Sequence, residues 1–577
     1  MLQRILPPTP AAPSLPIASA TSPTPFPQTL EYSPAARGTW NIVHTGMLLP
    51  ESHQIYICAS GCLRGVILTA AEMGESYYRR FHTLELQERD LYATDPETFL
   101  VEGITNILHR LPELPPAVLT FTACVHHFLG VNLPYVYRTL RHRFPSVQFA
   151  ECIMDPIRQT KSMPPETRER LEIARLLKKS PLPPEDVTAA PSDREQSDRL
   201  RNHDRSDAAA SSLRDHNRSD AAAKRARKDS VKESSVESGG PSLPPPSHKP
   251  LPACINLLGN NLPLSPESDI AQILRRHGLR LRDFPRCRTY QDFQRMADSL
   301  ANLYTLPITK PAADDLATRL HQPNLYFPQA WTYEEIQTNL QRLETFLQKI
   351  HPTPQADREQ SDHLRPSERS SLRDHDRIDA AAKRARRDSV KESSVESCGP
   401  SLPPPSPDPS FATTDLRPQI ATLELRFESL RAQLEDTPLA LDSTFTPLPF
   451  SLARLLITHG LCVTEIYADT IAPDDELNFR WLKTHAPTIR LFPTKHPAMR
   501  TQPREHLDAS GRLPIALGQK ATYFTGTHHF LPHIEAGGHY GLEAIHWLQT
   551  ALSRAALLET APKPILRRKA YGAPSCI

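Results

Sequence analysis

Short apolar runs alternate along the chain with longer stretches in which apolar residues recur at helical spacing. This alternation is typical of βαβ units, in which helices join parallel strands and cover the sheet. In the first part of the chain it predicts strands at residues 55–57, 118–122 and 147–152, and helices at 63–73, 98–109 and 133–143. We therefore expect a parallel sheet there.

Two later stretches repeat the same alternation. The first of them predicts a strand at 254–258, a turn at 259–261 and helices at 268–277 and 290–300. The second predicts helices at 451–459, 476–484 and from 541 onward, with strands at 462–467, 489–492 and 521–524. The fold class that follows is α/β, with three Rossmann-like domains that have parallel sheets and are interrupted by two disordered repeat inserts.

Each insert contains one copy of a repeated segment, at 211–247 in the first insert and at 370–406 in the second. The two copies are nearly identical. Both copies are rich in Asp, Arg, Ser and Lys, and lack the apolar surface that would offset the entropy lost on ordering. The expected organisation is a disordered Pro-rich tail at 1–35, a Rossmann-like domain with the cluster cysteines at 36–178, a disordered insert at 179–250, a Rossmann-like domain at 251–350, a second disordered insert at 351–410, a Rossmann-like domain at 411–560 and a tail at 561–577.

The net charge and composition of the chain limit the kinds of binding partner that we expect for it. The formal net charge is +2, from 67 basic and 65 acidic residues, and favours neither nucleic acid nor an acidic membrane surface. The nine cysteines are scattered without a secretory signal, as expected of reduced thiols in the cytoplasm. No apolar run approaches the ~20 residues that span a bilayer. We expect a cytoplasmic protein that binds neither nucleic acid nor membrane.

Three cysteines follow the ends of predicted strands, namely Cys58, Cys62 and Cys124. The ends of parallel strands meet at one edge of a sheet, where α/β proteins bind ligands. Thiolates at such an edge can hold an iron–sulfur cluster. The helix after Cys62 should lower the pKa of a neighbouring thiol, and Arg64 should add positive potential.

Two alternatives remain open for these cysteines. A free cysteine is most often a small buried thiol in a core. Structural zinc is the second alternative, and His126 and His127 are its only local candidates, because no further close-spaced pair of cysteines or histidines lies nearby.

A candidate substrate pocket lies late in the chain, at His528, His529, His533, Gly537 and Gly538. Histidines can bind a metal, protonate a substrate near neutral pH, or simply line a domain interface. The glycine pair indicates a turn whose backbone approaches a ligand or a helix N-terminus. No Walker A sequence and no complete Gly-x-Gly-x-x-Gly fingerprint is present, so we expect no nucleotide on this chain.

Several motifs are shared with a known family: Gly-Thr-Trp-Asn-Ile-Val-His-Thr-Gly-Met at 38–47, the segments 58–65 and 70–74, Thr-Ala-Cys at 122–124 with Phe-Leu-Gly at 128–130, and the segments 463–469, 516–520 and 537–541. On these motifs the chain resembles the nitrogenase component 1 type oxidoreductases. That family includes the subunits of the nitrogenase molybdenum–iron protein and of light-independent protochlorophyllide reductase.

The resemblance implies that Cys62 and Cys124 occupy family cluster positions. A further family cysteine, expected near residues 36–38, is absent, and Cys58 is the candidate substitute. Relatives bury a bridging cluster between homologous subunits, so missing ligands could come from another chain. The absence of a cysteine near 302–309 counts against dinitrogen reduction with an iron–molybdenum cofactor.

The resemblance further implies a nitrogenase-like oxidoreductase subunit that performs electron transfer. An ATP-dependent iron–sulfur reductase protein would deliver electrons through the metal-binding cysteines to an unknown substrate. A homologous or identical second subunit would complete the complex. Two alternatives stand beside this hypothesis: a non-catalytic scaffold for metal-cofactor assembly, and a metal-free bilobed ligand-binding protein.

Overall fold

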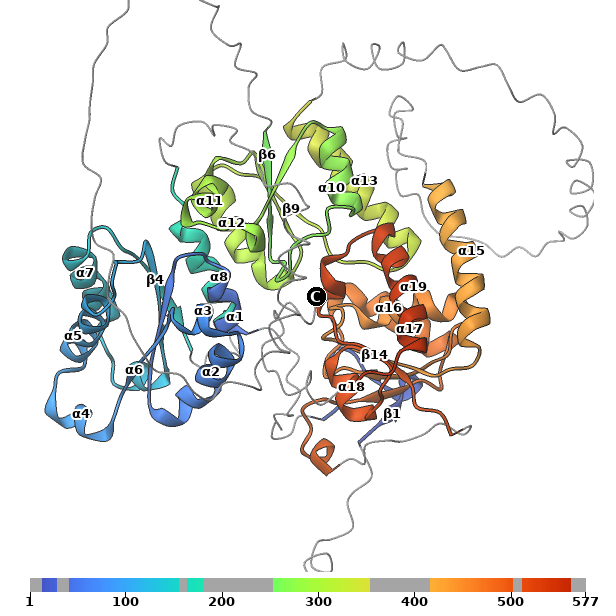
Figure 1. Ribbon diagram of the computed structural model, residues 1–577, viewed down its shortest axis with the longest axis horizontal. Coiled ribbons are helices and arrows are strands. Elements are labelled where there is room, and N and C mark those ends of the chain that lie inside the picture. Colours follow the sequence, from blue (N-terminus) through green and yellow to red (C-terminus); the bar gives the residue numbers. More distant parts are fainter. Residues whose placement is uncertain are drawn as a thin grey trace, which may run out of the picture. The chain divides into compact units, whose positions relative to one another are not determined.

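The computed structural model describes residues 13–27, 41–154, 163–179, 253–352, 416–501 and 511–561 (Figure 1). The strands of this part form three sheets, and all strand pairs are parallel except one. The predicted α/β class with parallel sheets is confirmed. The copied segments 211–247 and 370–406 lie outside the described residues.

The first sheet has the strand order β3-β2-β4-β5. Its strands are β2 (His53–Cys58), β3 (Phe81–Glu85), β4 (Ala117–Thr122) and β5 (Gln148–Ile153). Its helices are α1 (Ile42–Met47), α2 (Ser60–Glu72), α3 (Glu75–Tyr78), α4 (Glu88–Ala93), α5 (Pro96–His109), α6 (Cys124–Phe128), α7 (Leu133–Arg143) and α8 (Pro165–Leu176). Ile57 of β2 pairs with Thr122 of β4, so the chain leaves both strands at the same edge of the sheet.

The second sheet has the order β7-β6-β8-β9. Its strands are β6 (Cys254–Leu258), β7 (Arg280–Asp283), β8 (Ala301–Tyr304) and β9 (Asn324–Tyr326), and its helices are α10 (Asp269–Arg276), α11 (Tyr290–Gln294), α12 (Lys310–Arg319) and α13 (Tyr333–Ile350). The helix predicted at 290–300 is too long. It ends at Gln294, a 3-10 turn follows to Asp298, and the amide of Leu300 then donates to the Cys254 carbonyl and draws the chain into the sheet.

The third sheet has the order β1-β12-β11-β10-β13-β14. Its strands are β1 (Leu15–Pro16), β10 (Leu439–Asp442), β11 (Val463–Tyr467), β12 (Arg490–Phe492), β13 (Ile515–Leu517) and β14 (Phe530–Leu531). Its helices are α15 (Arg417–Leu434), α16 (Pro449–Thr458), α17 (Glu476–His485), α18 (Gln519–Thr525) and α19 (Leu542–Leu557).

The strand predicted at 521–524 is wrong, because these residues belong to helix α18. The helix begins after Gly518, whose φ of 106° is readily adopted only by glycine. The buried carboxylate of Asp442 then accepts a hydrogen bond from the amide of Ala521 at 2.7 Å. This bond satisfies one of the amides that have no partner at the start of a helix. The strand in this region is β13, which ends just before Gly518.

Part of the stretch expected to be an unfolded tail is ordered. Strand β1 pairs antiparallel with β12, and Figure 1 shows this blue segment among the orange-red strands of the third sheet. The amide of Ile17 donates to the Ile489 carbonyl at 2.8 Å, and the Ile17 side chain is fully buried. The prolines around it do not prevent pairing, because an edge strand needs amide donors on one side only.

The hydrophobic cores are continuous across the sheets. Leu257 of the second sheet and Leu441 of the third belong to one buried cluster, together with Trp331. Tyr56 and Phe293 share another cluster, which joins the first sheet to the second. Among the described helices, none is long and apolar enough to cross a bilayer.

Candidate functional site

The three predicted ligand cysteines lie at the carboxyl edge of the first sheet, which we call the cysteine edge. Cys58 is the last residue of β2 and is fully buried. Cys62 lies in the first turn of α2 and is exposed, whereas Cys124 is the first residue of α6 and is half-buried. Arg64 is exposed on α2. Cys58, Cys62 and Cys124 are free thiols.

The pKa of Cys58 is affected by burial and by the other two thiols. Burial raises the pKa of Cys58, and the negative charges of the ionised Cys62 and Cys124 raise it further, to about 12. Cys58 ends β2 and Cys124 follows β4, the strand paired with β2, so both thiols lie at the same edge of the sheet. Strand order therefore brings together residues that are far apart in the sequence.

The expectation that helix α2 lowers the pKa of a neighbouring thiol is wrong for Cys58. The helix begins at Ser60, earlier than predicted, and the amide of Cys62 already donates to the Ala59 carbonyl at 3.0 Å. The desolvation of a buried thiol favours its neutral form, and it is the main cause of the raised pKa of Cys58.

The donor set fits part of an iron–sulfur site. Three neighbouring thiols are the ligand type that such clusters take. Within the described ranges, however, no three Cys, His, Asp or Glu side chains converge so as to hold a metal ion. His126, a candidate for the zinc alternative, is buried and its ring Nδ1 lies 3.2 Å from the amide of Ala123 at the start of α6. The described part of the chain therefore supplies thiols, which are the ligand type of such a cluster.

The predicted histidine pocket does not converge on one point. The Nδ1 atom of His529 lies 2.9 Å from the Ala555 carbonyl, whereas the ring of His533 packs edge-on against Trp547. Ala555 and Trp547 both belong to α19 and lie roughly 12 Å apart along the helix axis, so the two histidines contact different parts of that helix. His528 is exposed. Burial, together with the nearby charge of His539, lowers the pKa of His533 to about 4.

The predicted glycine turn exists, and its backbone is left-handed throughout. Glu535, Ala536, Gly537 and Gly538 have φ values of 45°, 48°, 66° and 83°. A Cβ atom on Gly538 would lie 2.2 Å from the carbonyl oxygen of Pro263. The close approach at Gly538 is therefore made to the loop after β6, and it explains why glycine is required.

A buried polar centre, which the sequence did not reveal, consists of Arg170, Asn261, Glu535, Glu166 and Glu169. Arg170 of α8 donates from Nη2 to the side-chain oxygen of Asn261 at 2.5 Å. The backbone and side-chain amides of Asn261 donate to the Glu535 carboxylate at 3.0 and 2.5 Å. One residue from each predicted domain thus meets in a single network.

Burial shifts the carboxyl groups of the buried polar centre toward their neutral form. Burial raises the pKa values of Glu166, Glu169 and Glu535, and the charge of Arg170 opposes that rise for all three. Glu169 is fully buried, and neither of its carboxyl oxygens has a hydrogen-bond partner among the described residues. Such a group is costly in its ionised form unless a charge or a donor compensates it.

Comparisons with known proteins bear on the fold. The chain is similar to a solved structure described as nitrogenase Cp1 at pH 6.5, with a TM-score of 0.50 and 9% sequence identity over 92% of this chain and 94% of that one. A structure of nitrogenase Cp1 at pH 5 aligns with a TM-score of 0.45 and 10% identity, over 97% of this chain and 91% of that one. No family model matches the chain. No curated protein matches it either.

The likeness to nitrogenase Cp1 at pH 6.5 spans nearly the full length of both chains. At 9% identity this likeness shows that the chain has a nitrogenase-like fold, and it shows the fold only. The resemblance drawn from the sequence motifs is confirmed at this level.

Proposed function

We propose that this protein is one subunit of a nitrogenase-like oxidoreductase. A separate ATP-dependent iron–sulfur reductase protein would supply electrons to a cluster held by Cys58, Cys62 and Cys124. The electrons would then reach a substrate bound between the Rossmann-like domains. The observation that carries the proposal is the placement of the three cysteines at one sheet edge, at the end of β2 and in the first turns of α2 and α6.

The cluster would supply one-electron transfer, and the chain would adjust its potential. Burial around Cys58 and hydrogen bonds to the sulfurs are the protein's means of doing so. Arg64 lies two residues after Cys62, exposed on α2, where its positive charge would favour thiolate ligands. In this proposal the cluster is shared with a second subunit, which would supply the ligands that the described residues lack.

Exposed apolar side chains beside the cysteine edge support that second subunit, which would be homologous or identical. Phe128, four residues after Cys124 on α6, is 70% exposed, and its neighbour Leu129 is 44% exposed. Tyr92 of α4 is 83% exposed. Large exposed apolar groups near one another often mark protein–protein contacts. A partner seated there would also shield Cys62 from water.

The buried polar centre supports a substrate position between the domains. A reduction that consumes protons requires acids that are neutral near physiological pH, and Glu166, Glu169 and Glu535 are shifted in that direction. Arg170 lies among them and would bind an acidic group or a developing negative charge.

Anaerobic purification tests the proposal directly. Iron and sulfide analysis, with electron paramagnetic resonance after reduction, should detect a cluster in the wild-type protein and its loss in Cys62→Ala. Cys462→Ala is the matched control, since this half-buried cysteine precedes β11, away from the cysteine edge. The proposal would be overturned if the wild-type protein, isolated together with the chains that co-purify with it, contained no stoichiometric iron.

A second candidate is a scaffold that carries a cluster for another enzyme. The exposure of Cys62 favours it, because a cluster must be accessible in order to leave. Transfer of iron to a recipient protein, with no turnover when a reductase partner is added, would distinguish this function from the first.

A further inference from the structure

A pocket of about 470 Å³ lies between helices α7 and α8 and strand β5, and we call it the basic pocket. Pockets that bind small molecules usually have volumes of ~300–1,000 Å³. Val147 and Phe149 line it and are buried members of a core cluster of the first sheet, so this apolar wall is held in place. The basic pocket lies beside the first half of β5, whereas the cysteine edge lies at the carboxyl ends of the strands. The two sites are therefore separate.

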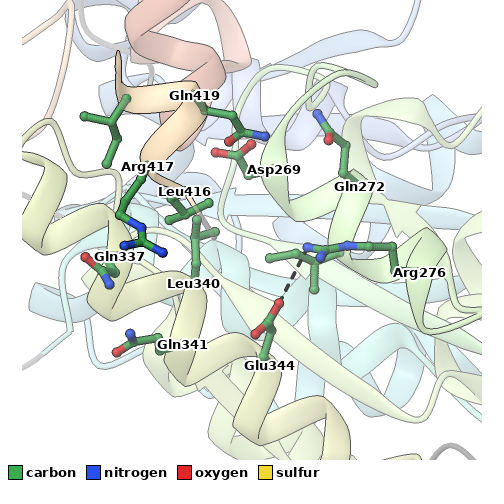
Figure 2. Close-up of a pocket in the computed structure, with 12 residues that line it drawn as sticks. Asp269, Gln272, Arg276, Gln337, Leu340, Gln341, Glu344, Leu416, Arg417 and Gln419 are labelled. Atoms are coloured by element: carbon green, nitrogen blue, oxygen red, sulfur yellow. Dashed lines mark ion pairs between the residues drawn. The ribbon is translucent and has the colours of Figure 1, made fainter. Parts of the chain in front are cut away.

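Positive charge exceeds negative charge around the basic pocket. Its charged lining residues are four cations and two carboxylates, namely Arg141, Arg168, Arg175 and Lys178 with Glu151 and Glu172. The pocket between α10, α13 and α15 differs, because it is lined by two arginines and two carboxylates (Figure 2). Of these two pockets, the basic pocket is therefore the one whose charge favours an anionic ligand.

The three arginines of the basic pocket belong to one network of ion pairs and hydrogen bonds. Nη2 of Arg141 lies 2.8 Å from Oε1 of Glu151, and Nε of Arg168 donates to the Glu151 carbonyl at 3.4 Å. Oε1 of Glu172 lies 2.9 Å from Nη2 of Arg168 and 2.8 Å from Nη1 of Arg175. This network holds guanidinium groups from two helices around one pocket.

The network leaves donors on each of these arginines, because a guanidinium has five N–H groups. Among the described residues, Arg141 forms hydrogen bonds through Nη2 alone, and Arg168 through Nη2 and Nε. Arg175 binds Glu172 through Nη1 and pairs through Nε with Asp315 at 3.6 Å. The Arg141 guanidinium also lies over the ring of Tyr137, at 5.7 Å from the ring centre, and stacking does not occupy its N–H groups.

We propose that the basic pocket binds a phosphomonoester, a small organic molecule whose phosphate group carries two negative charges. Arg141, Arg168 and Arg175 would bind the phosphate oxygens, because the planar fork of arginine matches phosphate through two parallel hydrogen bonds. Lys178 would add a fourth positive charge, since its exposed side chain has no ion pair among the described residues. The pocket is much larger than a phosphate group, so the organic part of the ligand would fill the rest and contact Phe149.

Isothermal titration calorimetry on the full-length protein tests this site, with phenyl phosphate in one arm and inorganic phosphate in the other. We expect saturable binding of phenyl phosphate and weaker binding of inorganic phosphate, which has no organic part to contact the apolar wall. In Arg141→Gln and in Arg175→Gln the affinity for phenyl phosphate should fall about tenfold, because each substitution removes a charged hydrogen bond to the phosphate.

Arg138→Gln is the matched control, because Arg138 is exposed on the same helix as Arg141 and does not line the pocket. It should bind phenyl phosphate as the wild-type protein does. Arg141 and Arg175 are exposed, so both variants should fold, and their thermal unfolding verifies it. The proposal would be overturned by a lack of phenyl phosphate binding, by equal affinities for the two probes, or by affinities of the two variants that match that of Arg138→Gln.

Discussion

The carboxylate of Glu535 accepts hydrogen bonds from both the backbone amide and the side-chain amide of Asn261. The same side chain of Asn261 accepts from Arg170. Asn261 is 4% exposed and Arg170 is 6% exposed, so water cannot easily replace these bonds. Asn261 is therefore the residue on which the buried polar centre depends.

Replacing Asn261 by alanine should destabilise the protein by ~1–3 kcal/mol, because it leaves buried polar groups without partners. Asn324→Ala is the control. Its side-chain amide donates to Asp314 at an exposed site, and its loss should have a much smaller effect. Urea denaturation measures both free energies of unfolding. Equal losses of unfolding free energy in the two variants would show that the hydrogen bonds of Asn261 contribute no more to stability than an exposed hydrogen bond does.

Gly538→Ala should be more damaging than Gly278→Ala. Both glycines have positive φ, of 83° and 68°, so both substitutions strain the backbone. The added Cβ at Gly538 meets the Pro263 carbonyl oxygen at 2.2 Å, whereas at Gly278 it meets nothing within 4 Å. We expect the difference to be ~1–3 kcal/mol, the usual cost of an overpacked site. Thermal or urea unfolding of the two variants gives the comparison.

The cysteines of the metal-free protein should differ in reactivity. Cys62 is exposed and should react first with iodoacetamide, because alkylation requires an accessible thiolate. Cys58 is fully buried with its pKa raised to about 12, so it should stay unmodified at mildly alkaline pH. Peptide mass spectrometry over a time course measures both rates. Rapid labelling of Cys58 would contradict the burial of this thiol.

Asp475 should make stability depend on pH. Its carboxylate accepts from the amides of Phe450 and Ser451 at the start of α16. Burial is the main cause that raises its pKa from 3.8 to about 7, and the charge of Glu335 adds to it. Between these values the folded state binds more protons than the unfolded state does. The stability contribution is therefore present below pH 3.8 and is lost as pH rises toward about 7.

Asparagine does not titrate, so Asp475→Asn should gain stability relative to the wild type across that window. The gain is at most about 1.4 kcal/mol for each pH unit. Denaturation at several pH values measures it as the difference between the two curves. Parallel curves would show that Asp475 titrates alike in the folded and unfolded states.

Most of the sheet architecture could be predicted from the sequence, because buried parallel strands such as β4 and β6 are mostly apolar. Placing Cys58 and Cys124 at one edge followed from strand order. Helix α18 could not be predicted in this way. Ala521 and Phe524 are apolar in either structure, and the carboxylate that caps the helix, from Asp442, lies far away in the sequence.

The buried polar centre was missed for a related reason. Helix α8 contains many charged residues, and such a sequence normally lies on a surface. In the structure, Glu169 and Arg170 are buried because α8 packs between β5 and α12. Only tertiary contacts reveal this burial. Glu535 was hidden similarly, since the glycine pair after it predicts a turn but does not indicate that its carboxylate meets Asn261, which is far away in the sequence.

The N-terminal strand β1 covers the outer edge of β12. A shortened chain that began at residue 41 would leave the amides and carbonyls of β12 facing solvent, together with the hydrophobic site that Ile17 fills. Unpaired edges of this kind recruit strands from neighbouring molecules. Strand β1 thus occupies an edge of the third sheet that would otherwise be open to pairing with another copy.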